Sequence, residues 1–252
     1  MMHLSSLAIL TLLFFITSLI GAVTGSNSLI TVPVMFQFGL DPKIAVATNM
    51  FGLTFMAIGA TIPFLRQDKI DFKKAAPLVT LTVIGSAIGA ALVGLFTGGG
   101  IKLIVSIAMI AVAIFTLINR DAGVSSHNFV SRRAVVATYI ATFLLGIYGG
   151  LYSGGYVTIL TAVLVAFFGM TFSESVASTK FINIFSSLTA TVVFAWQGLI
   201  DYKLGAVLAV TMFVGAFIGA HWASKMNDKW LKRIFLATVF ILALKILFDF
   251  VR

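Results

Sequence analysis

Apolar stretches long enough to cross a membrane recur from one end of this 252-residue chain to the other. An α-helix rises 1.5 Å per residue, so about 20 apolar residues cross the ~30 Å hydrocarbon core of a bilayer. Residues 9–20 and 105–118 are apolar almost throughout and lack the alternation of a transmembrane barrel strand. The chain is 60% hydrophobic and 10% charged, too apolar for a water-soluble domain. We therefore predict an all-α polytopic membrane protein.

Breaks at Gly, Pro and charge clusters divide the chain into ten apolar segments. The predicted segments are 4–23, 28–40, 43–65, 75–97, 101–118, 134–150, 156–170, 176–196, 204–224 and 231–250. Two of them, 28–40 and 156–170, are short, and each follows a Gly- and Ser-containing break, at 21–28 and 149–155. We expect both breaks to lie at membrane depth. The first segment lacks the basic start of a secretion signal, so we expect it to be retained as a span.

The two halves of the chain resemble each other. A shift of 130 residues aligns them without a gap, and 25 of the 95 pairs from Gly25/Gly155 to Asn119/Asp249 are identical, against about one in twelve by chance. Each half holds five segments, and an odd number requires the second copy to enter the membrane in the opposite orientation. We predict two inverted five-segment repeats, residues 1–120 and 134–252, joined by a basic cytoplasmic loop at 121–133.

The basic residues favour this topology. If every segment crosses and the N-terminus lies outside, eleven Lys and Arg fall in cytoplasmic loops and four fall outside, as the positive-inside rule requires. If the two short segments are re-entrant, the basic loop at 225–233 is expected on the side opposite 66–74 and 120–133, and the bias nearly vanishes. The eleven are Arg66, Lys69, Lys73, Lys74, Arg120, Arg132, Arg133, Lys225, Lys229, Lys232 and Arg233, and the four are Lys43, Lys102, Lys203 and Arg252.

Lys180 is the most informative single residue, because its apolar span contains no acidic residue except Glu174 near the start. A charge inside the bilayer is unfavourable by several kcal/mol unless it is compensated. Lys180 either snorkels to the headgroups or faces the protein interior and attracts an anion. A polar face at helical spacing favours the second interpretation, and it comprises Ser178, Thr179, Asn183, Ser186 and Ser187. Lys245 has apolar neighbours and is expected to snorkel.

The two breaks add further candidate contacts for an anion. Thr48 and Asn49 supply neutral donors at the corresponding turn of the first half, where Met50 replaces Lys180. A helix N-terminus after a Gly-rich break exposes unpaired N–H groups that favour an anion. The alternative is that small residues only permit close packing, as we expect for Gly85/Gly89 and Gly215/Gly219. The side chains predicted to line the breaks are Ser26, Asn27, Ser28, Ser153 and Tyr156.

Several function classes lack their sequence signals. The chain has no Cys, and its three His have no metal-ligand spacing. No Walker A motif, dinucleotide fingerprint or Ser/His/Asp constellation is present. We therefore expect no metal, no cofactor and no enzymatic activity. The net charge of +9 is assigned to topology anchors rather than to nucleic-acid binding.

Both halves carry stretches that resemble the two signatures of the TauE/SafE sulfite exporter family, and the resemblance covers essentially the whole chain. The first signature falls on residues 21–33, 39–42 and 45–49, with Thr24, Ser26 and Asn27 where the family usually has a denser glycine run. The second falls on 149–150, 154–155, 169, 177–180 with Asn183, and 198–201. The resemblance implies transport of sulfite, sulfonates or sulfoacetate across the cytoplasmic membrane.

The leading hypothesis is a secondary transporter, an exporter of small anions. The alternatives are a passive anion channel and a structural or assembly membrane protein without a substrate. An intramembrane Lys and paired broken segments argue against the structural protein. The expected partners are a small organic or inorganic anion and the lipid bilayer, without nucleic acid, and a homo-oligomer is left open.

Overall fold

The computed structural model describes residues 4–25, 27–118 and 131–237, and in this part of the chain it contains ten helices and no strand. The helices are α1 (Leu4–Thr24), α2 (Ser28–Gln37), α3 (Pro42–Leu65), α4 (Phe72–Val93), α5 (Gly98–Ile118), α6 (Arg132–Leu151), α7 (Tyr156–Phe167), α8 (Phe172–Trp196) and α9 (Tyr202–Ser224), followed by a tenth over residues 228–237. Six of them are long and apolar enough to cross a membrane. The predicted all-helical membrane protein is confirmed, and the ends of α1 to α9 lie within four residues of the predicted segments.

Acidic residues cap the N-termini of several helices. Asp41, Asp71 and Asp201 each accept two backbone N–H groups at the start of α3, α4 and α9. Thr171 and Glu174 form a reciprocal capping box at the start of α8. These side chains satisfy N–H groups that a helix leaves unpaired at its first turn. None of the acidic side chains in the described residues is buried.

The helices form two bundles that exchange one helix each. The first bundle consists of α1, α2, α3 and α9, because α9 packs along both α1 and α3. The second bundle consists of α4, α6, α7 and α8, because α4 packs along both α6 and α8. The contact of α3 with α8 joins the two bundles. Each half of the chain thus completes its own bundle with a helix from the other half.

Glycines permit the closest helix contacts in both bundles. A Cβ on Gly85 of α4 would lie 2.7 Å from the carbonyl oxygen of Phe143 in α6, and a Cβ on Gly215 of α9 would lie 2.7 Å from that of Phe15 in α1. One turn further on, Gly89 and Gly219 face backbone carbonyls of the same partner helices. This confirms the packing role predicted for these four glycines. Because lipid is as apolar as the side chains, helix association in a bilayer depends on such close packing.

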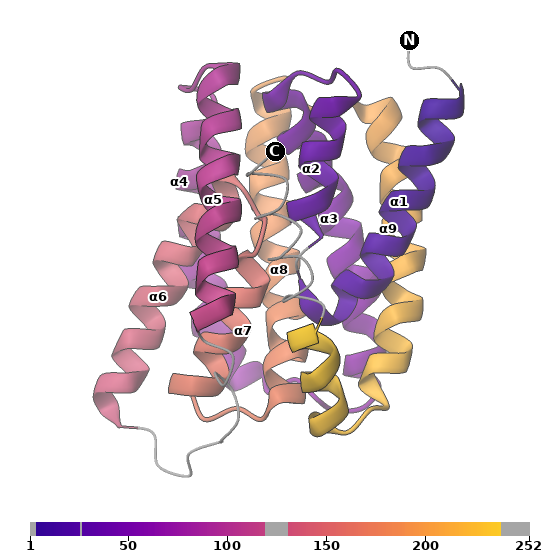
Figure 1. Ribbon diagram of the computed structural model, residues 1–252. Helices are drawn as coiled ribbons and strands as arrows, with labels where there is room; N and C mark the ends of the chain where they lie inside the picture. Colours follow the sequence, from indigo (N-terminus) through magenta and orange to yellow (C-terminus); the bar gives the residue numbers. More distant parts are fainter. Residues whose placement is uncertain (1–3, 26, 119–130, 238–252) are drawn as a thin grey trace.

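The short helices turn back inside the molecule. In Figure 1, α1 descends from the upper end and α2 returns to that end, whereas α6 rises from the lower end and α7 returns there. With 10 and 12 residues, α2 and α7 are about 15 and 18 Å long, roughly half of a bilayer core. Both breaks therefore lie in the interior of the molecule, between its two ends.

Hydrogen bonds between loops define the two ends. At one end, Lys43 Nζ donates to the carbonyl oxygen of Gly94 at 3.0 Å. At the other end, Gln67 Nε2 donates to Ser224 Oγ at 3.0 Å. We call the first the sparse end, since its described basic residues are Lys43, Lys102 and Lys203. The second is the basic end, with Arg66, Lys69, Lys73, Lys74, Arg132, Arg133, Lys225, Lys229, Lys232 and Arg233.

The basic loops therefore lie at one end of the molecule, although α2 and α7 are each only about half as long as a bilayer core is thick. The expectation that re-entrant short segments would place 225–233 opposite 66–74 is wrong. The reason is that α1 and α2 enter and leave as a pair at the same end, and α6 and α7 do the same at the opposite end. A re-entrant pair leaves the side of every later loop unchanged. Arg120, most of the predicted loop at 121–133, Lys245 and Arg252 lie outside the described residues.

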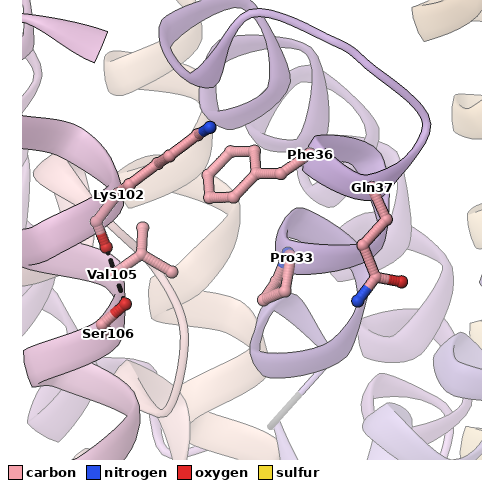
Figure 2. Close-up of a pocket in the computed structure, with 6 residues that line it drawn as sticks. All are labelled: Pro33, Phe36, Gln37, Lys102, Val105 and Ser106. Atoms are coloured by element: carbon pink, nitrogen blue, oxygen red, sulfur yellow. Dashed lines mark hydrogen bonds between the residues drawn. The ribbon is translucent and has the colours of Figure 1, made fainter. Parts of the chain in front are cut away.

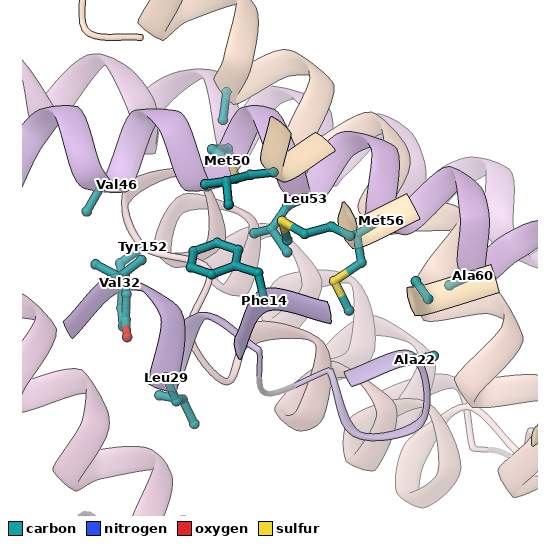
Figure 3. Packing of buried hydrophobic residues seen from close by; sticks show 14 of the residues in the cluster. Phe14, Ala22, Leu29, Val32, Val46, Met50, Leu53, Met56, Ala60 and Tyr152 are labelled. Carbon is teal, nitrogen blue, oxygen red and sulfur yellow. The ribbon is translucent and has the colours of Figure 1, made fainter. Parts of the chain in front are cut away.

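The core of the first bundle is rich in methionine. Figure 3 shows Phe14 of α1 among Met50 and Leu53 of α3, with Met56 nearby. A separate cluster in the second bundle gathers Leu78, Tyr156, Val157, Leu160, Leu164, Met170 and Ile182. The two bundles share an arrangement of helices but fill it with different side chains.

Candidate functional site

The two helix breaks meet each other. Gly25, in the first break, has a φ of +70° and packs so closely on α7 that an added Cβ would lie 2.5 Å from Cβ of Val157. The hydroxyl of Thr158 donates to the carbonyl oxygen of Thr24 at 2.7 Å. Gly155, in the second break, has a φ of +80°. Only glycine adopts these left-handed conformations without strain, which explains why both breaks contain it.

A buried polar network, here called the central network, joins the breaks. Ser28 Oγ and Ser153 Oγ lie 2.7 Å apart, so one residue from each break takes part. Asn49 Nδ2 donates to Ser28 Oγ at 2.9 Å, and Thr31 Oγ1 donates to Asn49 Oδ1 at 2.8 Å. The hydroxyl of Tyr152 donates to the carbonyl oxygen of Ser28 at 2.9 Å. The structure thus brings together Ser28, Asn49 and Ser153 and adds Thr31 and Tyr152, which sequence reasoning missed.

Lys180 of α8 is also buried, with only 2% of its surface exposed. Its Nζ donates to the carbonyl oxygen of Gly21 at 2.7 Å. Gly21 belongs to the last turn of α1, where the helix dipole is negative, and its carbonyl oxygen also accepts the backbone N–H of Gly25 at 2.8 Å. No carboxylate pairs with Lys180 in the described part of the chain. The snorkelling interpretation is therefore wrong, because the ammonium group is held inside the protein.

The polar face of α8 continues on both sides of Lys180. Thr179 Oγ1 lies 3.1 Å from Thr161 Oγ1 of α7 and donates to the carbonyl oxygen of Val176. Ser178 Oγ is buried without a hydrogen-bond partner among the described residues. Asn183 is 7% exposed. This face points inward along much of α8, as the spacing of its residues predicts.

The remaining predicted contacts lie in different surroundings. Thr48 Oγ1 accepts the backbone N–H of Asp201 at 3.0 Å, so it holds the turn between α8 and α9 and does not join the central network. Asn27 Nδ2 donates to Ser18 Oγ at 2.9 Å, while its Oδ1 is buried without a partner within the described ranges. Tyr156 is buried at the start of α7, with its ring against Gly149. Ser26 lies outside the described residues.

A groove of ≈ 360 Å³ lies apart from the central network, between α2 and α5 (Figure 2). It is lined by Pro33, Phe36, Gln37, Lys102, Val105 and Ser106. Figure 2 shows Ser106 hydrogen-bonded to the carbonyl oxygen of Lys102, at 2.9 Å. None of the predicted site residues lines this groove, so it is a feature of the outer surface rather than part of the site.

Comparisons with known proteins identify similar chains. A family model described as "Sulfite exporter TauE/SafE" matches residues 10–246. A "Probable membrane transporter protein ORF9" of Sinorhizobium sp is 27% identical over 96% of this chain and 93% of its own length. The "Probable membrane transporter protein YfcA" of Escherichia coli strain K12 is 24% identical over 96% and 90%. A "Probable membrane transporter protein" of Haemophilus influenzae is 24% identical over 96% and 95%. No solved structure matches the chain significantly.

Proposed function

The chain belongs to the sulfite exporter TauE/SafE family, and from that premise we propose that it is a secondary transporter that exports small anions across the cytoplasmic membrane. Sulfur-containing anions such as sulfite, sulfonates and sulfoacetate are the proposed class. The observation that carries the proposal is the buried Lys180, which lacks a carboxylate partner in the described residues. A buried cation in a membrane protein requires compensation. A transported anion provides it, together with the carbonyl oxygen of Gly21.

The proposed site lies between the helix breaks. Ser28, Ser153 and Asn49 hydrogen-bond to one another in this structure, and an oxyanion can accept the same hydrogen bonds in their place. Lys180 supplies the charge, and Ser178, Thr179, Asn183 and Asn27 extend the polar lining. Tyr156 belongs to a separate group of buried hydroxyls in the second bundle, which is described below. Ser26 is retained only by its place in the first break, and Thr48 supports the site indirectly through the α8–α9 turn.

We propose that residues 1–120 and 134–252 are inverted repeats. The sequence match supports this, as do the corresponding glycine contacts of α4 with α6 and of α9 with α1. The positive-inside rule then places the basic end in the cytoplasm and the sparse end outside. Rearrangement of α2 and α7 opens the site to each side in turn, as expected for broken helices from opposed repeats.

The electrical potential is the proposed driving force. A membrane that is negative inside drives an anion outward by about 2.3 kcal/mol per charge per 100 mV. No buried carboxylate is present in the described residues to carry a coupled proton. We propose that export runs on the potential alone, without a coupled proton. Flux from liposomes that follows a clamped potential at equal pH on both sides is the expected result, and flux that follows only a pH gradient contradicts it.

The test of the function combines binding and transport. A panel of anions containing sulfite, sulfoacetate, sulfate and chloride is added to purified protein, and the melting temperature is recorded, because a ligand of the native state raises it. Liposomes then report the flux of radiolabelled sulfite. We expect stabilisation and saturable flux with sulfur oxyanions and neither with chloride. Absence of both for every sulfur oxyanion overturns the proposed function.

A further inference from the structure

A second group of polar side chains lies in the second bundle, away from the central network. It consists of Thr82 and Ser86 of α4, Tyr156 of α7 and Ser186 of α8, and we call it the hydroxyl cluster. Ser86 Oγ and Ser186 Oγ lie 2.6 Å apart. The Tyr156 hydroxyl faces those of Thr82 and Ser186, but neither it nor the Thr82 hydroxyl makes a hydrogen bond of ordinary geometry in the described part of the chain. All four side chains are at most 2% exposed.

These hydroxyls are not needed for the packing of a bundle of this kind. The 130-residue shift pairs Thr82 with Met212, Ser86 with Ala216 and Ser186 with Met56. In the first bundle these positions are buried and apolar. A buried hydroxyl without a partner is unfavourable by about 1–3 kcal/mol, and inside a bilayer no lipid group can satisfy it. The hydroxyl cluster is therefore polar where the first bundle is apolar, and its Thr82 and Tyr156 hydroxyls are free to form a better hydrogen bond with a ligand.

The charge around the hydroxyl cluster selects the kind of ligand. Lys180 and Ser186 lie on the same helix, and six residues correspond to a rise of about 9 Å. Asn183 lies between them at a spacing of three residues from each, which places all three on neighbouring turns. The described part of the chain has no buried carboxylate to balance Lys180. This field favours an anion and disfavours a metal cation, although hydroxyl oxygens alone could bind either.

We propose that the hydroxyl cluster is a second binding position for the transported anion, an inference that rests on the proposed function. Because α8 runs from the basic end to the sparse end (Figure 1), Ser186 lies closer to the sparse end than Lys180. The anion passes from Lys180 along Asn183 to the hydroxyl cluster. Ala90 and Val93 of α4 and Phe194 of α8 follow Ser86 and Ser186 toward the sparse end, and all three are fully buried.

The experiment removes single hydroxyl groups without changing side-chain shape. Tyr156→Phe and Thr82→Val each delete a hydroxyl that makes no hydrogen bond of ordinary geometry within the described residues, whereas Thr82→Ser keeps the hydroxyl and deletes a methyl group. The matched control is Thr61→Val, since Thr61 is 1% exposed and its hydroxyl bonds only to its own helix, at Ala57. Each protein is tested for melting temperature, for equilibrium binding of radiolabelled sulfite and for sulfite flux from liposomes.

We expect Tyr156→Phe and Thr82→Val to slow flux about tenfold or more, the effect of losing one hydrogen bond to a charged ligand. Their melting temperatures stay equal or rise, and both still bind sulfite at Lys180. Thr82→Ser and Thr61→Val transport within about twofold of the wild type. Wild-type flux in Tyr156→Phe and Thr82→Val overturns this inference alone. Loss of flux in Thr82→Ser also overturns it, because packing then explains the effect. A wild type that neither binds nor transports sulfite overturns the proposed function as well.

Discussion

The first and second bundles have the same helix contacts and different interiors. In each bundle a short helix follows a break, and a pair of glycines allows one helix to pack closely on its neighbour. The first bundle surrounds its break with Asn49, Thr31 and a methionine-rich core. The second bundle contributes Lys180 and the hydroxyl cluster, in which Thr82 and Tyr156 make no hydrogen bond of ordinary geometry within the described residues. The two bundles therefore share a helix arrangement, while the one buried charge of the described residues lies in the second bundle.

The single charge acts across the boundary between the bundles. Lys180 belongs to the second bundle, yet its ammonium group binds the end of α1 in the first. Met50 occupies the corresponding position of the first bundle and is 1% exposed. A positive charge at both positions would place two unpaired cations in the interior. One charge in two similar halves is therefore the arrangement that suits a single small anion.

Lys180→Met has the largest expected effect, because it makes the two bundles alike at this position. A unit charge 4 Å from an anion contributes about 4 kcal/mol at an effective dielectric constant of about 20, which corresponds to about a thousandfold in rate. We expect sulfite flux from liposomes to fall to background while the melting temperature is maintained. Lys203→Met, at an exposed position at the start of α9, is the control. Wild-type flux in the Lys180→Met protein contradicts the assignment.

Gly89→Ala and Gly219→Ala test whether the scaffolds are equivalent. Each added methyl group falls on a backbone carbonyl oxygen, of Ile147 or Leu19. Overpacking of this kind is typically unfavourable by about 1–3 kcal/mol. We expect both variants to lower the melting temperature by similar amounts. Gly99→Ala serves as the control, since the nearest atom to an added Cβ is 4.0 Å away. A large effect in only one of the two bundles shows that their scaffolds differ.

Asn49→Leu and Asn183→Leu separate structure from transport. Asn49 bonds to both Ser28 and Thr31, so its loss leaves buried groups unpaired and lowers stability by about 1–3 kcal/mol. For Asn183 the described part of the chain offers no side-chain hydrogen bond, and we expect flux to fall with little change in melting temperature. The melting temperature and the sulfite flux from liposomes are measured for both variants. A larger fall in melting temperature for Asn183→Leu than for Asn49→Leu would contradict these roles.

Lys102→Met is expected to have the smallest effect. Lys102 lines the outer groove between α2 and α5 (Figure 2), apart from the central network. Sulfite flux should remain within about twofold of the wild type, a difference of roughly 0.4 kcal/mol in barrier. A loss comparable to that of Lys180→Met would instead place the groove on the transport route.

The helices, the breaks and the glycine contacts could be predicted from sequence, because each has a local signal. Apolar length predicts a span, and Gly in a repeated position predicts a break or a close contact. The burial of Lys180 followed from the polar residues around it. These features depend on residues close together in the chain, which explains the agreement.

Other features depend on contacts between distant residues and were not predictable. No sequence pattern marks Tyr152 as a site residue, because its hydroxyl bonds to Ser28, which is 124 positions away in the chain. Thr48 resembles a site residue by position, but the α8–α9 turn takes its hydroxyl. The sequence also left open whether residues 28–40 and 156–170 cross the membrane, since hydropathy measures the length of a segment and not its place among the other helices.

Protection of a thiol where the two helix breaks meet is the most direct test of an anion site between them. The chain has no Cys, so Ser153→Cys introduces a single reactive group beside Ser28. Its rate of modification by iodoacetamide is measured with and without sulfoacetate, in the presence of Lys180 and in the Lys180→Met background. We predict that sulfoacetate slows modification only when Lys180 is present. Equal rates with and without sulfoacetate, in a protein that still transports sulfoacetate, would contradict an anion site between the helix breaks.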